Sequence, residues 1–202
     1  MEANTAPGGG GGAVFLVGDF GFSSANSTYF GNSALFGGGL NLQANGGFGP
    51  DVLIGTSTFV GNESSFPGAA DQIYGTWNNC GLYNSIIAHD PAAPVLLDPF
   101  CIAPLDEGQH NLIDDASCDT GLAGFQLGQV IGLDFKLRYN GGLTRTHAID
   151  ATSNAVDAGR NAACRNPHTG AALVVDQRGE PRPVDFDLNG TAESDIGAKE
   201  LQ

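Results

Sequence analysis

The carboxylates near the end of the chain are the side chains best suited to chemistry. In the segment 185–190, Asp-Phe-Asp-Leu-Asn-Gly, oxygen-bearing side chains stand at alternate positions before a glycine. This pattern matches the first half of a calcium-binding loop, in which the glycine allows a sharp bend. The expected bidentate Glu is replaced by Ile196. The segment predicts either an acidic β-turn paired with nearby arginines or a structural Ca²⁺, the only cofactor expected, held by Asp185, Asp187, Asn189, Glu193 and Asp195.

A second acidic pair is Asp114-Asp115. Adjacent residues of a strand point to opposite faces, so these two carboxyl groups do not form a facing acid and base. A lyase acting on polyuronates also needs cationic groups beside the substrate carboxylate. No catalytic residue is assigned, and we expect a protein that is not an enzyme. A carbohydrate-active β-helix enzyme, hydrolase or lyase, is kept as an alternative.

The charged residues are distributed unevenly along the chain. The formal net charge is −14, and all 8 Lys and Arg residues lie after position 135. Such an acidic surface repels nucleic acid and anionic lipid. The chain has no run of eighteen apolar residues, so no membrane-spanning segment is expected. The N-terminal residues carry no export signal. We therefore expect no nucleic-acid partner and no membrane insertion.

Similar phrases recur along the first two thirds of the chain. Ser27–Asn32 (Ser-Thr-Tyr-Phe-Gly-Asn) returns thirty residues later as Ser57–Asn62 (Ser-Thr-Phe-Val-Gly-Asn), and Ser85–Ala88 begins a third copy. Units of this length that cannot bury a face alone are typical of solenoid coils. With 31 Gly residues and few charges, the composition favours short strands and turns over helices. Residues 1–135 thus predict an all-β, parallel β-helix.

The expected strands are short segments rich in β-forming residues, each read as one side of a coil. A Pro-rich excursion from the coils is expected near 90–109. Asn32 and Asn62 occupy equivalent corners, where their amides could stack into a ladder. The expected strands are Ala13–Val17, Ser27–Phe30, Gly39–Leu42, Val52–Ile54, Ser57–Val60, Gln72–Tyr74, Gly81–Tyr83 and Asn84–Ala88.

Three phrases in the last third carry a family resemblance. They are Asn140–Ala148 (Asn-Gly-Gly-Leu-Thr-Arg-Thr-His-Ala), Ala155–Gly159 (Ala-Val-Asp-Ala-Gly) and Asp176–Pro183 (Asp-Gln-Arg-Gly-Glu-Pro-Arg-Pro), the last followed by Asp195–Glu200 (Asp-Ile-Gly-Ala-Lys-Glu). In this order they resemble the choice-of-anchor Q domain of bacterial surface proteins. The resemblance implies a right-handed parallel β-helix closed by a C-terminal module, here 136–202.

The expected role of this module is to cap the unpaired edges and apolar side chains of the last coil. Arg145, Arg178 and Arg182 are expected to pair with Asp157, Asp176 or Asp195. His147 is expected to be a hydrogen-bonded structural residue. The expected capping residues are Asn140, Gly141, Gly142, His147, Asp157, Asp176, Arg178, Arg182 and Asp195.

Four cysteines without a C-x-x-C pair favour disulfides over zinc. Cys101–Cys118 is the preferred bond, because it closes a loop with little else to hold it, and members of the family carry two cysteines in this region. The family also has Cys where this chain has Ser194. Cys164 therefore lacks its implied partner, and is either free or bonded to Cys80.

These observations predict a non-enzymatic extracellular or cell-surface β-helix with a structural or adhesive role. Its expected partners are glycans or other surface proteins. The alternative is a self-assembling block that associates through an open, Gly-rich first coil.

Overall fold

The computed structural model describes residues 1–19, 21–44, 51–92, 99–101, 105–118, 125–128 and 130–202. Within these ranges every paired strand is parallel to its neighbours, and no helix is long and apolar enough to cross a membrane. The strands are β1 (Thr5–Gly10), β2 (Val14–Val17), β3 (Phe22–Ala25), β4 (Thr28–Phe30), β5 (Ser33–Phe36), β6 (Leu40–Gln43), β7 (Asp51–Gly55), β8 (Thr58–Val60), β9 (Glu63–Ser64), β10 (Ile73–Gly75), β11 (Asn79–Tyr83), β12 (Ile86–Ala88), β13 (Glu107–Gln109), β14 (Asn111–Ile113) and β15 (Phe125–Leu127), and the 3₁₀ turns are η1 (Ala116–Cys118) and η2 (Asn161–Ala163).

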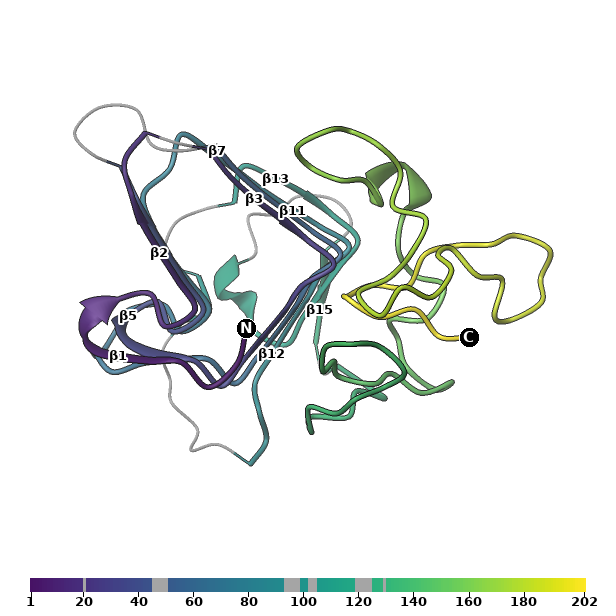
Figure 1. Cartoon of the computed structure of the whole chain (residues 1–202), viewed down its shortest axis with the longest axis horizontal. Coiled ribbons are helices and arrows are strands. Elements are labelled where there is room, and N and C mark those ends of the chain that lie inside the picture. The colour runs from purple at the N-terminus through teal and green to yellow at the C-terminus, as the bar shows by residue number, and fades with distance from the viewer. Residues whose placement is uncertain (20, 45–50, 93–98, 102–104, 119–124, 129) are drawn as a thin grey trace.

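The strands form four sheets that stack coil upon coil, which confirms the β-solenoid (Figure 1). Sheet 1 holds β1-β5-β9, sheet 2 holds β2-β6-β10, sheet 3 holds β3-β7-β11-β13 and sheet 4 holds β4-β8-β12-β14-β15. The predicted repeat is the coil itself, since Thr28 lies opposite Thr58 and Thr58 lies opposite Ile86. Each of the first three coils contributes four strands, namely β1–β4, β5–β8 and β9–β12.

The corner between sheets 3 and 4 is built in the same way in successive coils. Asn26, Thr56, Asn84 and His110 occupy it in turn, with φ of 47°, 44°, 47° and 54°. Left-handed backbone is unfavourable for residues with a Cβ, least so for Asn, and Thr56 is a β-branched exception. Thr56 is held by the corner above, because its Oγ1 donates to Asn26 Oδ1 at 3.1 Å. These four residues are called the left-handed corner below.

The interior is filled by side chains stacked at equivalent positions. Tyr29 and Phe59 are opposite residues of β4 and β8, and their rings stack with centroids 4.4 Å apart. The Tyr29 hydroxyl lies 2.7 Å from Ser24 Oγ, so its polar end is also satisfied. Ile87 continues the stack in the next coil and is fully buried. Thr28, Thr58 and Ile86 are partners in register, so the repeat is 28 to 30 residues long here. Stacking of side chains at equivalent positions lets such a repeat bury a continuous core.

The predicted amide ladder is present and longer than expected. Asn4 Nδ2 donates to Asn32 Oδ1 at 2.8 Å, and Asn32 Nδ2 donates to Asn62 Oδ1 at 2.7 Å. Asn62 Nδ2 then donates to Gln72 Oε1 at 2.6 Å. Asn32, Asn62 and Gln72 are buried, so the ladder satisfies amides that would otherwise be costly inside the solenoid.

The Gly-rich segment Thr5–Gly10, which is not among the expected strands, forms strand β1 and pairs with β5. The tight points follow β1 and β5, at Gly12 and Gly38. A Cβ on Gly38 would lie 2.2 Å from the backbone nitrogen of Glu63 in the next coil. Glycine is required there because two backbones approach each other closely.

The Pro-rich excursion is shorter than predicted. Phe100 accepts a backbone hydrogen bond from Ile73, Cys101 forms a bridge to the same residue, and β13 pairs with β11. The described parts of 90–109 therefore include pieces of sheets 2 and 3. Residues 93–98 and 102–104 lie outside the described residues.

The C-terminal module begins near Val130, soon after β15 (Phe125–Leu127), and lies along the flank of the solenoid (Figure 1). Its position differs from the expected place over the last coil, for a reason visible in sheet 4. The outward side chains of that sheet include Val60, Ile86 and Leu112, which are at most 1% exposed. They pack against Leu133, Ile149, Ala155 and Ile196 of the module.

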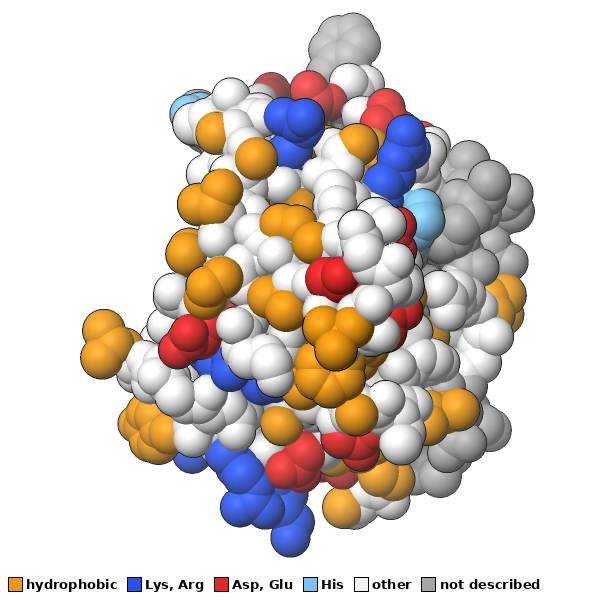
Figure 2. Space-filling view, turned by 90° about the vertical axis from the view of Figure 1, so that its right-hand side faces the viewer, with side chains coloured by type: hydrophobic (Ala, Val, Ile, Leu, Met, Phe, Trp, Pro, Cys, Tyr) orange, Lys and Arg blue, Asp and Glu red, His pale blue; other side chains and the backbone are white. Residues whose placement is uncertain are grey.

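The module's outer surface carries hydrophobic side chains with Lys and Arg above and below them (Figure 2). The module itself contains isolated antiparallel bridges and η2, but none of the strands of the described chain. Its conformation is therefore held by side chains and turns, and by the sheet on which it packs.

Replacing Asn62 with Ala should lower the free energy of unfolding by about 3 kcal/mol, because it leaves several buried partners unsatisfied. Urea unfolding followed by circular dichroism measures this. Asn4→Ala, at the exposed end of the ladder, is the matched control and should cost less than about 1 kcal/mol. Equal losses in the two variants would contradict a cooperative buried ladder.

Candidate ligand-binding site

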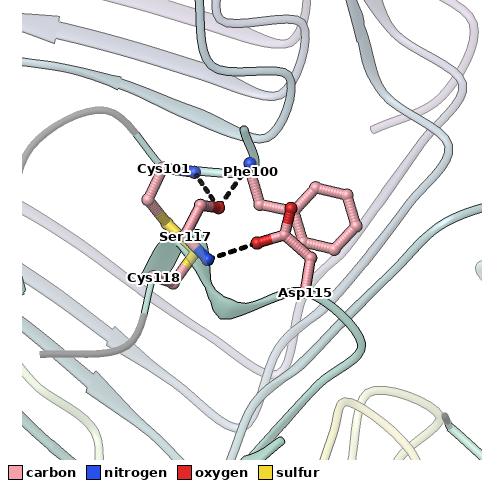
Figure 3. Close-up of a disulfide and its surroundings, with 5 residues drawn as sticks. All are labelled: Phe100, Cys101, Asp115, Ser117 and Cys118. Carbon is pink, nitrogen blue, oxygen red and sulfur yellow. Dashed lines mark hydrogen bonds between the residues drawn. A yellow bond between two sulfur atoms is a disulfide. The ribbon is translucent and has the colours of Figure 1, made fainter. Parts of the chain in front are cut away.

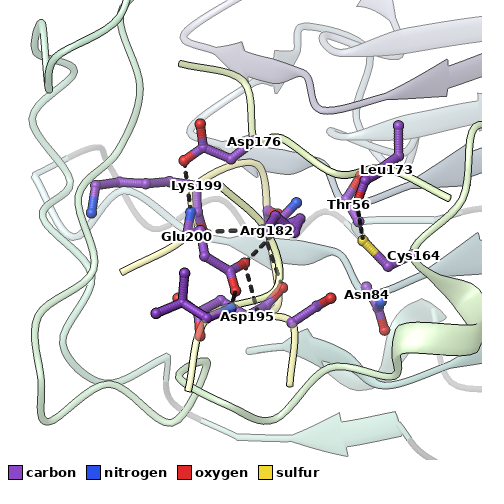
Figure 4. Close-up of polar contacts among 12 residues, drawn as sticks. Thr56, Asn84, Cys164, Leu173, Asp176, Arg182, Asp195, Lys199 and Glu200 are labelled. Carbon is purple, nitrogen blue, oxygen red and sulfur yellow. Dashed lines mark hydrogen bonds and ion pairs between the residues drawn. The ribbon is translucent and has the colours of Figure 1, made fainter. Parts of the chain in front are cut away.

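The centre of the module is a buried arginine that contacts both the module and the solenoid (Figure 4). Arg182 Nε donates to Glu200 Oε2 at 2.6 Å, and both side chains are fully buried. Arg182 Nη1 reaches Asn26 Oδ1 of the left-handed corner at 3.1 Å. Its Nη2 donates to the carbonyls of Asp195, Gly197 and Lys199. A buried charge needs such complete pairing.

A second ion pair lies beside the first. Arg178 Nη2 is 2.7 Å from Asp176 Oδ2, with side-chain exposures of 7% and 0%. This pairing was predicted, whereas Arg182 pairs with Glu200 and Arg145 pairs with Glu2. Neither acid was among the expected partners. Asp195 was expected in the place of the nearby Glu200, and Glu2 is remote from the module in sequence.

Asp195 is an acceptor for the backbone rather than an ion-pair partner. Its Oδ1 accepts from Asp157 N at 2.8 Å and its Oδ2 from Leu201 N at 2.5 Å. Burial and the neighbouring Glu200 carboxylate raise the pKa of Asp195 to about 7.

The remaining expected capping residues are also structural. Asn140 Nδ2 donates to Thr146 O at 2.8 Å, and Gly141 has a φ of 103°. A Cβ on Gly142 would lie 2.7 Å from the Arg178 Cα. His147 is 2% exposed with Nδ1 2.9 Å from Asp134 O, and burial lowers its pKa.

The structure does not bring the five expected calcium ligands together. Asp185 Oδ1 and Asp187 Oδ1 both accept from Asn189 N, so the two carboxylates close their own turn. Asp195 is 1% exposed and points into the module, as described above. Among the described residues no group of three or more His, Cys, Asp or Glu side chains is placed to hold a metal. The segment is an acidic turn, but within the described residues neither Asp185 nor Asp187 forms an ion pair, so the expected pairing with arginines is not found.

The predicted disulfide is confirmed. Cys101 and Cys118 are bonded, with Cα atoms 5.0 Å apart (Figure 3). Ser117 supports the bond, since its Oγ accepts from Phe100 N at 2.7 Å. The cross-link joins Phe100–Cys101, which passes sheet 2, to the 3₁₀ turn η1.

Cys80 and Cys164 are both free and buried, so the alternative of a bond between them is wrong. Cys80 lies inside the solenoid, whereas Cys164 lies in the module. The Cys164 thiol donates to Leu173 O at 3.8 Å, and the Ser194 hydroxyl donates to Asn161 Oδ1 at 2.9 Å. Burial raises the pKa of the thiol, and the neighbouring Ser194 side chain opposes that rise. Ser194 therefore occupies the place at which a disulfide partner for Cys164 would stand.

We expect Ser194→Cys to form a second disulfide with Cys164 in air. Intact-mass measurement should show the loss of two hydrogens beyond those lost at Cys101–Cys118, about 2 Da. Unfolding should require more denaturant, because the bond closes a loop of about thirty residues and should add about 3 kcal/mol. The control is Ser194→Ala, and a free thiol at both positions in the Cys variant would contradict the prediction.

Asp114 and Asp115 do not face each other as an acid and base. Asp114 Oδ2 accepts from His89 N at 2.8 Å, and its Oδ1 lies 3.1 Å from His89 Nδ1. This contact raises the pKa of His89. Asp115 instead accepts from Ser117 N at 2.5 Å. Both carboxylates thus hold the backbone of a corner.

A candidate site is a groove of about 500 Å³ between sheet 3 and the module. Leu53, Tyr83, Glu107 and Gln109 form its floor, on the outward face of β7, β11 and β13. The loop 160–170 of the module, which includes η2, forms its wall. The groove is called the sheet 3 groove below.

The floor depends on a small residue next to a large one. A Cβ on Gly81 would lie 2.8 Å from Tyr83 Cε2 and 3.1 Å from Leu53 Cδ2. The Tyr83 ring therefore lies over the sheet at Gly81. Its hydroxyl donates to Glu107 Oε2 at 2.5 Å, and burial together with Glu107 raises the Tyr83 pKa to about 12. The phenol stays neutral and presents an amphipathic ring to the groove.

The wall is fixed to the left-handed corner. Asn84 Oδ1 accepts from Arg160 N at 2.9 Å, and Asn84 Nδ2 donates to Arg160 O at 3.0 Å. The side chains of Arg160 and Arg165 line the groove. No sequence pattern indicated this site, since it joins residues of the acidic first part to two arginines of the module.

Comparison with protein-family models, curated proteins and solved structures found no match to this chain. The resemblance to choice-of-anchor Q domains therefore stays a prediction from the three phrases quoted above. Evidence about function therefore comes only from the fold and from the sheet 3 groove.

Proposed function

We propose that this chain is a non-enzymatic extracellular β-solenoid with an adhesive role, and that the sheet 3 groove holds a glycan of the surface to which it adheres. The observation that carries the proposal is the groove itself. An aromatic ring, amide groups and a carboxylate line a cavity of about 500 Å³ on a rigid sheet, and this combination suits the apolar faces and hydroxyls of sugars.

The chemistry of the other polar groups supports binding over catalysis. Asp114, Asp115, Asp185 and Asp187 all accept backbone hydrogen bonds, and the buried acids of the module hold its own chain. The disulfide Cys101–Cys118 supports an oxidising, extracellular location.

The proposal is tested by binding the immobilised chain to a panel of bacterial and plant oligosaccharides. We expect retention of at least one glycan class, and recovery of the bound oligosaccharides at their original length after a day. Release of shortened or unsaturated products would overturn the non-enzymatic role, and retention of no glycan on the panel would overturn the adhesive one.

A steric variant locates the binding surface. Ala162→Trp places a bulky side chain in the wall of the groove and should abolish retention. Ala151→Trp, also exposed in the module but outside the groove, should leave it intact. Equal retention by both variants would place adhesion elsewhere on the surface.

A second candidate function, self-assembly, is favoured by one observation at the other side of the solenoid. Strand β2 is an edge strand, and its outward Phe15 and Val17 are 53% and 48% exposed. The edge of β4 is covered, because Met1–Ala3 pair with Phe30. An exposed apolar edge is a template for another strand.

Light scattering at rising concentration tests this assembly. We expect dimers or longer species that revert to monomer in Phe15→Lys combined with Val17→Lys, because charges at an edge prevent pairing. Phe66→Lys, at a comparable exposure of 49% but away from β2, is the control. A monomer at all concentrations would overturn self-assembly.

A further inference from the structure

We infer that the ligand of the sheet 3 groove is an anionic oligosaccharide, whose carboxylate or sulfate groups are bound by Arg160 and Arg165. This inference rests on the adhesive function proposed above and names the class of its ligand. It starts from the way in which the arginines of this chain are paired.

Four of the six arginines form ion pairs with carboxylates. Arg138 pairs with Asp134, Arg145 with Glu2, Arg178 with Asp176 and Arg182 with Glu200. Within the described part of the chain, Arg160 and Arg165 have no carboxylate at ion-pair distance. In a protein with a net charge of −14, the two arginines left without an acidic partner both line the same groove.

Both guanidinium groups are nevertheless held in place by neutral oxygens. Arg160 Nη1 donates to the side-chain amide oxygen of Gln109. Arg165 Nε donates to Ala162 O and its Nη1 to Gly170 O, each at 2.9 Å. These contacts fix the position of the charges without neutralising them. Pre-positioned guanidinium groups with free N–H donors are well suited to carboxylate and sulfate oxygens.

The groove contains one opposing charge, the Glu107 carboxylate. Its Oε2 accepts from the Tyr83 hydroxyl, so part of its acceptor capacity is used inside the protein. Two guanidinium groups against one carboxylate leave the groove locally positive. The remaining Glu107 oxygen can accept a hydrogen bond from a sugar hydroxyl. A ligand that carries only anionic groups would have no such donor.

A saccharide suits the groove better than an acidic peptide. Extended peptides bind to sheets by hydrogen bonding to a free strand edge. The floor here is the face of sheet 3, where β7 and β11 are paired on both sides. The Tyr83 ring over Gly81 and the amides of Gln109 and Asn166 instead offer stacking and hydroxyl contacts.

The test is calorimetric titration of the whole chain with three oligosaccharides of equal length: an oligogalacturonate, its methyl-esterified neutral form and a sulfated galactan fragment. We expect binding of at least one anionic oligosaccharide, at least 10-fold weaker binding of the neutral form, and weakening as salt rises from 50 to 300 mM. The preferred anion distinguishes a carboxylate from a sulfate ligand.

Arg160→Gln and Arg165→Gln should each weaken anion binding about 10-fold. Arg138→Gln removes the same charge outside the groove and is the matched control, so it should leave the affinity within about 2-fold. The backbone bonds of Arg160 to Asn84 do not involve its side chain, and unchanged melting temperatures would verify folding.

The outcomes separate this inference from the proposed function. Tight binding of a neutral glycan that is indifferent to both Arg→Gln changes would overturn the anionic ligand and keep the adhesive role. An equal effect of Arg138→Gln would reduce the result to net charge and also overturn the inference. Binding of none of the three oligosaccharides, together with no retention on the glycan panel, would overturn both.

Discussion

The attachment of the module depends on one buried positive charge, the guanidinium of Arg182. Around it the module wraps three of its own carbonyls and the Glu200 carboxylate, while Asn26 supplies a contact from the solenoid. Removing either charge would leave its partner uncompensated in a dry environment, which is far more costly than the pair's net contribution. The guanidinium is fully paired only when all these groups surround it. This requirement helps to define the fold of a module that has no strands of its own.

The left-handed corner connects the local backbone geometry to that interface. A left-handed residue points its peptide groups away from the regular pattern of the sheet, so they are free to bond outside the coil. Asn84 uses its backbone carbonyl for Gly197 N and its side chain for Arg160, and His110 Nδ1 lies 3.0 Å from Ala158 O. The bend that closes each coil also provides the contact with the module.

The sequence was informative where the fold repeats and uninformative where distant segments meet. The phrase from Ser27 to Asn32 and its copy determined the coil length, and equivalence of Asn32 and Asn62 predicted their bond. Strand β1 was missed because Thr5–Gly10 has turn composition, and its pairing comes entirely from β5. The need for glycine at Gly38 is visible only in the structure, where the backbones of successive coils pack closely.

The candidate site lies in the second category. Arg160 and Arg165 have no special spacing, and Tyr83 reads as an ordinary strand residue. In the sequence, the absence of Lys and Arg before residue 136 separates the cationic groups from the residues that form the solenoid. Folding removes that separation, since the module places two arginines over sheet 3. A one-dimensional charge pattern does not predict a three-dimensional one when a later segment covers an earlier face.

The flanking position of the module also limits how this solenoid can evolve. Solenoids commonly gain or lose whole repeats, because each coil contacts only its neighbours. Here the module contacts successive coils at Glu2, Asn26, Thr58, Asn84 and His110. A coil inserted between these positions would displace the contacts on one side of it by one strand spacing, about 4.8 Å, while the module keeps its length. A module of fixed length thus constrains the number of coils. Related chains with the same module are expected to differ in their loops rather than in their number of coils.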